Sequence, residues 1–328
     1  EITDELFPIS EYINGKFVSN NVSHIINNNL VYCLDLNLEY CGVIIKLNLY
    51  TLTKWNNKNK KILKKITRII KRILFIIHFF KDNTCNRGEI LKLDLFLISS
   101  NKKLPSKKEK IDVDNINSGV TTFTHDGIKN IIIYRSEEIE KLLVHELIHF
   151  FYLDFFEINC DLSDLLNVSP TLEFIPNESY TELMTLLINC KLITLELDEN
   201  KHKQNNTLAK EILYYELLFN YFQCAKILYH YNFHDTKKFF APFDKLSNST
   251  SHSKSNSASH SKSKSASHSK SNSASKSTFY QSSCILSYFF IKTALLTNLK
   301  KTTDYLTTNL TNYKIECTET SKKDYLQL

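Results

Sequence analysis

The sequence predicts an α+β fold, with a twisted mixed sheet and a backing helix in the N-terminal half and a mainly helical C-terminal half. Two observations support this prediction. Segments in which apolar and polar residues alternate, as they do in half-buried strands, lie before residue 135. Helical patterns dominate later, over about 178–198, 207–230 and 280–300. We therefore divide the chain into a sheet-plus-helix half, 1–160, and a helical half, 161–328.

Composition excludes several classes of protein. A chain of 328 residues can bury a substantial core, and its net charge of +6 is too mild to indicate a nucleic-acid partner. No uninterrupted apolar run reaches the ~18 residues that span a bilayer. The 8 cysteines form no C-x-x-C pair. This pattern favours free thiols in a reducing, cytoplasmic compartment over a disulfide-bonded extracellular protein. Because the chain begins at Glu1, the sequence leaves open whether a targeting segment preceded it.

The predicted strands follow one another in a simple order. Residues 30–52 indicate a hairpin that turns at Gly42, and residues 91–99 form a further alternating strand. Residues 119–124 and 131–134 are two short strands around the turn signal His125-Asp126-Gly127. We expect these last strands to flank the functional site.

A basic amphipathic helix is predicted over residues 58–80. Isoleucines recur at helical spacing on one side, and lysines and arginines crowd the other. One interpretation is a helix that binds a membrane surface or nucleic acid. We favour the other, a helix packed across the sheet with its basic side in solvent, and do not expect membrane contact through 58–80.

A low-complexity insertion is predicted at about 247–278. Within it, residues 251–274 repeat the unit Ser-His-Ser-Lys-Ser-Asn-Ser-Ala in near copies. Such a tract cannot bury a core, so we expect it to be disordered. Its histidines lack carboxylate partners, which favours a solvated loop over a metal-binding tract.

The most specific motif is His145-Glu146-Leu147-Ile148-His149. Residues four apart share one face of a helix, so both imidazoles can bind a single ion while Glu146 acts on a metal-bound water. A core helix with hydrogen-bonded histidines is the alternative. We favour the metal site because neighbouring leucines and phenylalanines already supply an apolar face, and burying His and Glu without a shared purpose is costly. Ser136 is expected to cap this helix, ahead of an acidic first turn.

A hydrolytic zinc site needs three protein ligands and an open position. The pattern His149-x-x-Gly-x-x-His is absent, because Tyr152 and Phe155 occupy those places. A following helix offers Glu178 and Glu182, one turn apart, with Asn177 as its expected cap. Glu173 remains a rival ligand, although the nearby Pro176 disfavours a helix just before it.

With these two motifs, residues 119–190 resemble the gluzincin metallopeptidases, the thermolysin-like clan. The chain is also similar to uncharacterised H-E-x-x-H proteins of large DNA viruses and unicellular parasites. The resemblance implies a zincin-like fold, Zn²⁺ bound by His145, His149 and Glu178, and a second acid, Glu182, that orients a ligand histidine. The spacing from His149 to Glu178 is 29 residues (178 − 149), which is longer than usual for that clan.

The same resemblance implies roles for other parts of the chain. An edge strand at Gly119, Val120 and Thr121 would pair with the substrate backbone. A tyrosine or histidine from the helical half would stabilise the oxyanion, and the candidates are Tyr288, His234 and His230. The expected activity is peptide-bond hydrolysis with Glu146 as general base. The alternative is a catalytically silent zincin-like protein that binds peptides or a protein partner.

Overall fold

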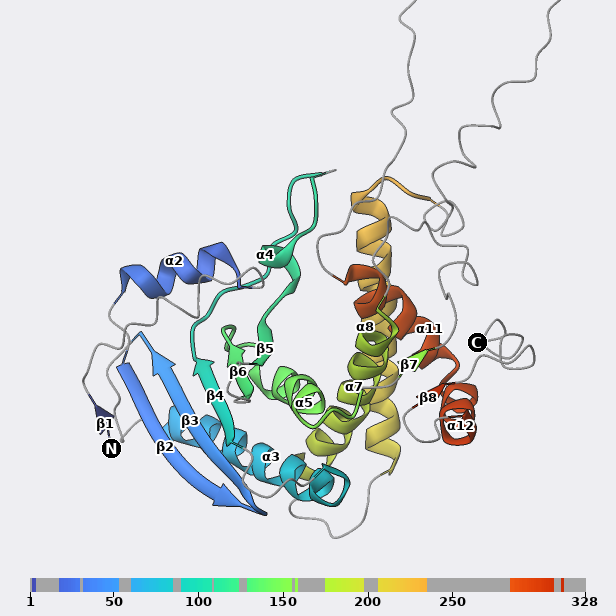
Figure 1. The fold of residues 1–328 in the computed structure, drawn as a ribbon. Helices are drawn as coiled ribbons and strands as arrows, with labels where there is room; N and C mark the ends of the chain where they lie inside the picture. The colour runs from blue at the N-terminus through green and yellow to red at the C-terminus, as the bar shows by residue number, and fades with distance from the viewer. Residues whose placement is uncertain are drawn as a thin grey trace, which may run out of the picture.

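The structure is a computed structural model that describes residues 2–3, 18–29, 32–52, 60–84, 90–107, 109–123, 129–154, 157–158, 175–197, 206–234, 284–309 and 314–315. The predicted insertion at 247–278, the turn at 125–127 and the rival ligand Glu173 lie outside these residues. The described chain has a mixed sheet on one side and a bundle of helices on the other, as Figure 1 shows. The predicted α+β organisation is therefore confirmed.

The sheet has six strands in the order β1-β2-β3-β4-β6-β5. β2 (Tyr32–Tyr40) and β3 (Val43–Thr51) form the expected antiparallel hairpin, and the very short β1 (Ile2–Thr3) pairs with β2. The hairpin turns at Cys41 and Gly42, whose φ angles are 50° and 82°. Two successive residues with positive φ match the right-handed twist of the flanking strands, and glycine adopts this conformation without strain.

The centre of the sheet is parallel. β3 pairs in parallel with β4 (Ile90–Phe96), and β4 pairs in parallel with β6 (Lys129–Ile133). Helix α3 (Lys60–Thr84) connects β3 to β4, as parallel neighbours require. A short helix, α4 (Val113–Ile116), leads into β5 (Gly119–Phe123), which runs antiparallel to β6 at the edge of the sheet.

Helices cover both faces of the sheet. On one face, α3 and α5 (Ile139–Phe150) join the strands in the largest apolar core, which buries residues such as Ile45, Leu93, Ile73 and Leu147. On the other face, α2 (Asn20–Asn28) packs Val22 and Ile26 against Tyr50, Phe96 and Ile132. The sequence analysis did not predict α2. The sheet is thus sandwiched between helix layers, and α5 lies directly beside β5 and β6.

The basic side of α3 is not simply solvated, contrary to expectation. Arg72 is only 2% exposed, and its guanidinium donates to the Glu196 carboxylate at 2.7 Å and to the side-chain oxygen Oδ1 of Asn189 at 2.8 Å. Arg68 pairs with Glu140 at 3.0 Å. These contacts tie α3 to α5 and α7, because buried arginine is tolerated when its donors are satisfied. None of the described helices has the length and hydrophobicity needed to cross a membrane.

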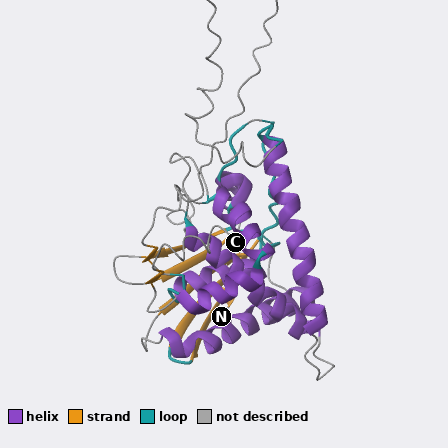
Figure 2. Ribbon diagram, turned by 90° about the vertical axis from the view of Figure 1, so that its right-hand side faces the viewer, coloured by secondary structure: helices purple, strands orange, loops and turns teal. Residues whose placement is uncertain are grey.

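The helical half consists of α7 (Pro176–Leu197), α8 (Asn206–His230), the π-helix η2 (Leu286–Ile291), α11 (Lys292–Thr297) and α12 (Leu299–Asn309). α7 packs on α5, and α8 stands along the outer side of the bundle, as Figure 2 shows from the side. Two small clusters of apolar residues hold α7, α8, η2 and α11 together. A two-stranded pairing of β7 (Glu157–Ile158) with β8 (Lys314–Ile315) was not predicted.

Two predicted helix starts are wrong. α5 begins at Ile139 after Glu138, and Ser136 does not cap it; within the described chain no side-chain hydrogen bond caps this helix. α7 begins at Pro176 rather than after Asn177. Proline fits the first helical position because its missing N–H would have no partner there. Asn177 is thereby inside the first turn, and its side-chain amide donates to the Asp154 main-chain carbonyl at 2.6 Å.

Candidate metal centre

Helix α5 presents His145 and His149 on the side that faces α7. Leu143, Leu147 and Phe150 enter the core beneath the sheet. His145 and Glu146 are also buried, at 5% and 4% exposure, whereas His149 is partly exposed. The helical period places His145 and His149 one turn apart on one face, and their Nε2 atoms lie 3.1 Å from each other. Both ring nitrogens therefore point to the same place, as predicted.

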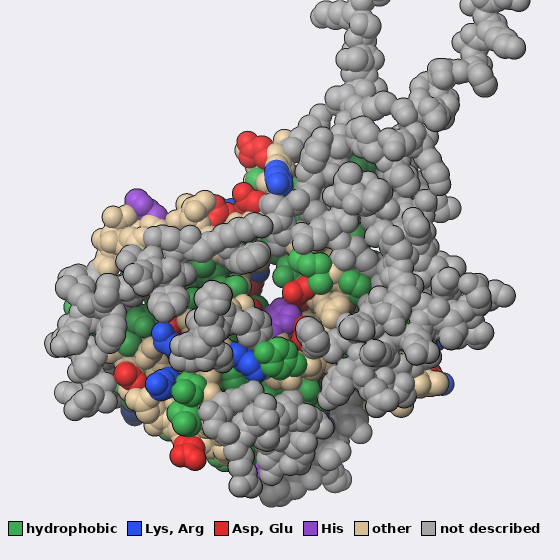
Figure 3. All heavy atoms as spheres, in the orientation of Figure 1, with side chains coloured by type: hydrophobic (Ala, Val, Ile, Leu, Met, Phe, Trp, Pro, Cys, Tyr) green, Lys and Arg blue, Asp and Glu red, His purple; other side chains and the backbone are tan. Residues whose placement is uncertain are grey.

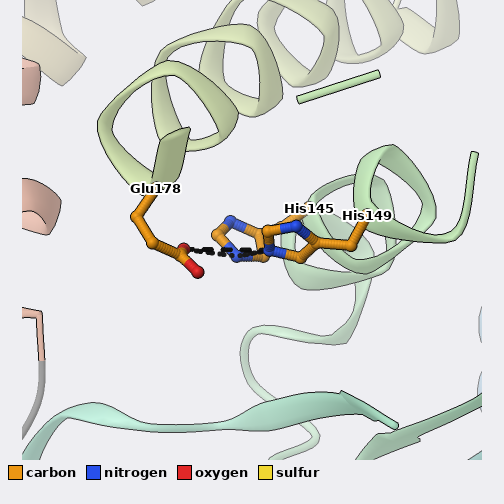
Figure 4. A group of neighbouring side chains, drawn as sticks. All are labelled: His145, His149 and Glu178. Atoms are coloured by element: carbon orange, nitrogen blue, oxygen red, sulfur yellow. Dashed lines mark hydrogen bonds and ion pairs between the residues drawn. The ribbon is translucent and has the colours of Figure 1, made fainter. Parts of the chain in front are cut away.

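The first turn of α7 brings Glu178 opposite the two imidazoles. Its Oε2 lies 3.6 Å from His145 Nε2 and 3.7 Å from His149 Nε2, and Figure 4 shows the three side chains converging from two helices. One donor atom from each residue lies within 4.8 Å of the other two. The predicted trio is therefore assembled, and it could hold a metal ion.

The polar contacts of this trio fit a cation. Glu178 Oε2 is buried and has no hydrogen-bond partner among the described residues. A buried carboxylate oxygen without a donor is costly. Two imidazole nitrogens also face each other at a distance where one of them must carry a proton or both must share a metal ion. A bound cation at the meeting point would satisfy all three atoms.

Glu182 supports His145 from the next turn of α7. Its Oε1 lies 3.1 Å from His145 Nδ1, although the two atoms are not aligned as a hydrogen bond in the described residues. Glu182 Oε2 accepts a hydrogen bond from Lys292 at 2.9 Å and lies 3.8 Å from Lys141 Nζ. Burial favours the neutral acid, but Lys292 and Lys141 hold the pKa of Glu182 well below its usual range. The carboxylate is thus kept charged beside the ligand histidine.

His149 has its own carboxylate, which the sequence analysis missed. Its Nδ1 lies 2.6 Å from Asp154 Oδ2, a hydrogen-bonded distance. α5 ends at Phe150, and Tyr152 adopts a φ of 54°, so the chain turns back and places Asp154 under the imidazole. Thr181 donates to the same Asp154 oxygen at 3.1 Å, and the Asn177 amide donates to the Asp154 carbonyl at 2.6 Å. The sequence did contain a signal for this contact, because Asp154 follows the second histidine of the motif by five residues.

These acids change the protonation of both histidines in the metal-free protein. Burial favours the neutral ring of His145, but Glu178 and Glu182 outweigh it and raise the pKa well above the usual value. Burial acts likewise on His149, and Asp154 raises its pKa. Because a metal ion needs neutral imidazoles, binding must release protons and should weaken as the pH falls.

The candidate base Glu146 lies against the edge strand. Thr121 Oγ1 is 2.5 Å from Glu146 Oε2, and Gly119 lies next to the other carboxylate oxygen. Val120 points to the opposite face of β5 and packs against the core around α2. The predicted substrate strand is therefore the strand that borders the motif helix.

A cavity of about 580 Å³ is lined by His145 of the trio and by Glu146. Its walls come from α5, α7, α8, η2 and the segment that leads into β5, and they include His145, Glu146, Gly119, Lys141 and Tyr288. Figure 3 shows histidine and acidic side chains at a hollow in the front face. The cavity therefore brings His145 and Glu146 to a common wall together with residues of the helical half.

The structure separates the three oxyanion candidates. Tyr288 lines the cavity, and its ring centroid lies 6.3 Å from that of His145. Burial, followed by nearby Glu178, raises its pKa, so the hydroxyl stays protonated and can donate. His230 instead bonds the Glu109 carbonyl at 2.7 Å, and His234 is exposed. Neither histidine is among the residues that line the described cavity.

Comparisons with known proteins identify no family. The chain is similar to an uncharacterised protein of Acanthamoeba polyphaga mimivirus, with 29% identity over 154 residues. The match covers 43% of this chain and 37% of that protein. No protein-family model matches the chain, and no solved structure matches it. Among the described residues, Cys33, Cys41, Cys190 and Cys224 are free thiols.

Proposed function

We propose that this protein is a zinc-dependent metallopeptidase. The observation that carries the proposal is the convergence of His145, His149 and Glu178. His145 and the neighbouring Glu146 also line an open cavity. Two imidazole nitrogens and one carboxylate oxygen are the ligands of hydrolytic zinc sites in which a fourth position stays open. Zinc fits this donor set better than magnesium or calcium, which prefer oxygen ligands.

In this proposal, each residue near the candidate metal centre has a separate role in catalysis. When bound, zinc would polarise the scissile carbonyl and activate a water molecule. Glu146 would accept a proton from that water and pass it to the leaving amine nitrogen. Tyr288, whose hydroxyl is protonated and whose ring borders the cavity, is the best placed oxyanion donor. Glu182 and Asp154 would hold the imidazoles in orientation.

The substrate would bind as an extended strand. β5 is the last strand at its end of the described sheet, and it borders the cavity through Gly119. An edge strand exposes unpaired backbone groups to which an extended peptide can add. Pairing of a peptide with β5 would carry its backbone past Glu146. Peptide or unfolded protein is therefore the expected substrate class.

The variant Glu146→Gln tests this function. It should keep about one zinc ion per chain and lose hydrolysis of an unfolded protein or a peptide library, because the amide has nearly the shape of the acid but cannot take the proton. Zinc content measured by atomic emission and peptide cleavage measured by mass spectrometry give the two results. Glu211→Gln, at an exposed position on α8, is the matched control and should retain both.

The possible results distinguish the peptidase from its alternatives. Equal turnover by Glu146→Gln and the parent protein would refute the assigned base. A parent protein that binds zinc tightly, binds peptides and cleaves none would support the silent peptide-binding alternative. A parent protein without zinc would refute the metal centre itself.

A further inference from the structure

Strand β5 lies against the carboxylate of the candidate base. The Thr121 hydroxyl lies 2.5 Å from Glu146 Oε2 and 3.5 Å from the Glu146 main-chain oxygen. Because a carboxylate only accepts, the hydroxyl must donate to it. A hydrogen bond to a charged acceptor is among the stronger polar contacts in proteins. One oxygen of the base is therefore held by the strand.

Gly119 leaves room for the other oxygen. A Cβ at this position would lie 3.1 Å from Glu146 Oε1, 2.8 Å from Leu142 Cδ2 and 3.0 Å from the Ile132 carbonyl oxygen. A side chain would therefore press on both the base and the backbone of β6. Residues two apart in a strand point to the same face of the sheet, so positions 119 and 121 both face α5. Together, Gly119 and Thr121 form the surface of β5 against which the Glu146 carboxylate packs.

The backbone groups of these two residues point toward the edge at which β5 ends the described sheet. The Tyr134 N–H donates to the Ser118 carbonyl at 2.9 Å, which makes Ser118 and Tyr134 a hydrogen-bonded pair of the antiparallel ladder. Hydrogen-bonded and non-hydrogen-bonded pairs alternate along such a ladder. The pairs of Gly119 with Ile133 and of Thr121 with Ile131 are consequently of the other kind. Their β5 backbone groups therefore point away from β6.

We infer that Thr121 is a positioning residue that fixes Glu146 to the strand on which the substrate backbone pairs. This inference rests on the proposed peptidase function. The side chain of Thr121 holds the base, and its backbone faces the position of an added peptide strand. Strand β5 would thereby position both the scissile peptide bond and the base Glu146. Loss of the hydroxyl should misplace the base without removing a metal ligand or a substrate contact.

The test uses three variants of the full chain. Thr121→Val keeps the shape of the side chain and removes its donor, and Thr121→Ser retains a hydroxyl. Thr122→Val is the control, because Thr122 faces away from Glu146 and its hydroxyl lies 3.4 Å from the Asn130 carbonyl. On a peptide that the parent cleaves, Thr121→Val should lower kcat about 10- to 100-fold, the loss expected for one hydrogen bond to a charged group. KM and zinc content should stay near the parental values.

Thr121→Ser should recover most of kcat, and Thr122→Val should keep it. A Thr121→Val variant with the parental kcat would overturn the inference, as would a variant that instead raises KM. A loss of kcat in Thr121→Ser without a loss in Thr121→Val would indicate a packing role, because valine keeps the shape of the side chain, and would also overturn the inference.

A second measurement does not depend on activity. The side-chain carboxyl carbon of Glu146 can be observed by NMR in protein labelled at glutamate, with its resonance assigned through Glu146→Gln. In the metal-free protein, Thr121→Val should shift this resonance, and Thr121→Ser and Thr122→Val should leave it close to the parental position. If the parent cleaves no peptide, the proposed function fails, yet this shift still tests the contact. An unchanged resonance in Thr121→Val would refute the inference even if the peptidase assignment holds.

Discussion

The two histidines of the candidate metal centre are supported in different ways. His145 faces Glu182 across the α5–α7 interface, and Lys292 of α11 and Lys141 of α5 bind that carboxylate in turn. His149 faces Asp154, which follows on the same stretch of chain and is held by Thr181 at 3.1 Å. One support is charged and spans three helices. The other is local, and the groups that brace its carboxylate are neutral.

The difference shows which parts of the centre depend on helix packing. Glu182 lies 37 residues from its histidine (182 − 145), whereas Asp154 lies five residues from its own (154 − 149). The position of Glu182 therefore requires α7 and α11 to dock on α5, while the turn after α5 already brings Asp154 near. Removal of Glu182 also leaves two ammonium groups without their shared anion beside a cation site. Removal of Asp154 leaves only neutral donors.

The largest expected effect comes from the ligand that both sides share. Glu178→Ala should lose most of its bound zinc, because it removes the only carboxylate of the trio that faces both Nε2 atoms. Zinc titration with a competing chelator measures the loss. Glu173→Ala is the comparison variant and should retain zinc. An empty site in Glu173→Ala beside a loaded site in Glu178→Ala would show that the ligand assignment is wrong.

The second largest effect on zinc affinity is expected from Glu182, the charged group that supports His145. Glu182→Gln should weaken zinc binding about 100-fold, at the upper end of the range for residues that orient a metal ligand, because Lys292 and Lys141 then repel the cation. The same titration measures it. Adding Lys292→Met to Glu182→Gln should recover part of the affinity. A double variant that binds zinc no better than Glu182→Gln would refute the electrostatic part of this explanation.

The smallest effect on zinc affinity is expected from Asp154, the acid that supports His149. Asp154→Asn should weaken zinc binding about 10-fold, because the amide oxygen can still accept from His149 Nδ1 but lacks the negative charge. Asp304→Asn, at an exposed position on α12, is the control and should bind zinc like the parent. An Asp154→Asn loss as large as that of Glu182→Gln would remove the distinction between the two sides.

The sequence by itself determined the periodic parts of this protein. The hairpin over 30–52, the helix near 58–80 and the strands near 91, 119 and 131 all follow from side-chain alternation, which depends only on neighbours along the chain. The alignment of His145 with His149 follows from the helical repeat in the same way. Glu178 was identified because it also stands within the first turn of a recognisable helix.

Only the tertiary structure decided which groups support those residues. The sequence shows that Thr121 lies in a strand, but the order β4-β6-β5 is what places that strand beside α5 and Glu146. Lys292 reaches Glu182 only because α11 packs against α7, and Asp154 reaches His149 because the chain reverses at Tyr152. Such contacts are set by packing between elements and by single backbone angles. Neither quantity is encoded in a local pattern. The convergence of the three candidate ligands could therefore be predicted from the chain, and most of the groups that contact them could not.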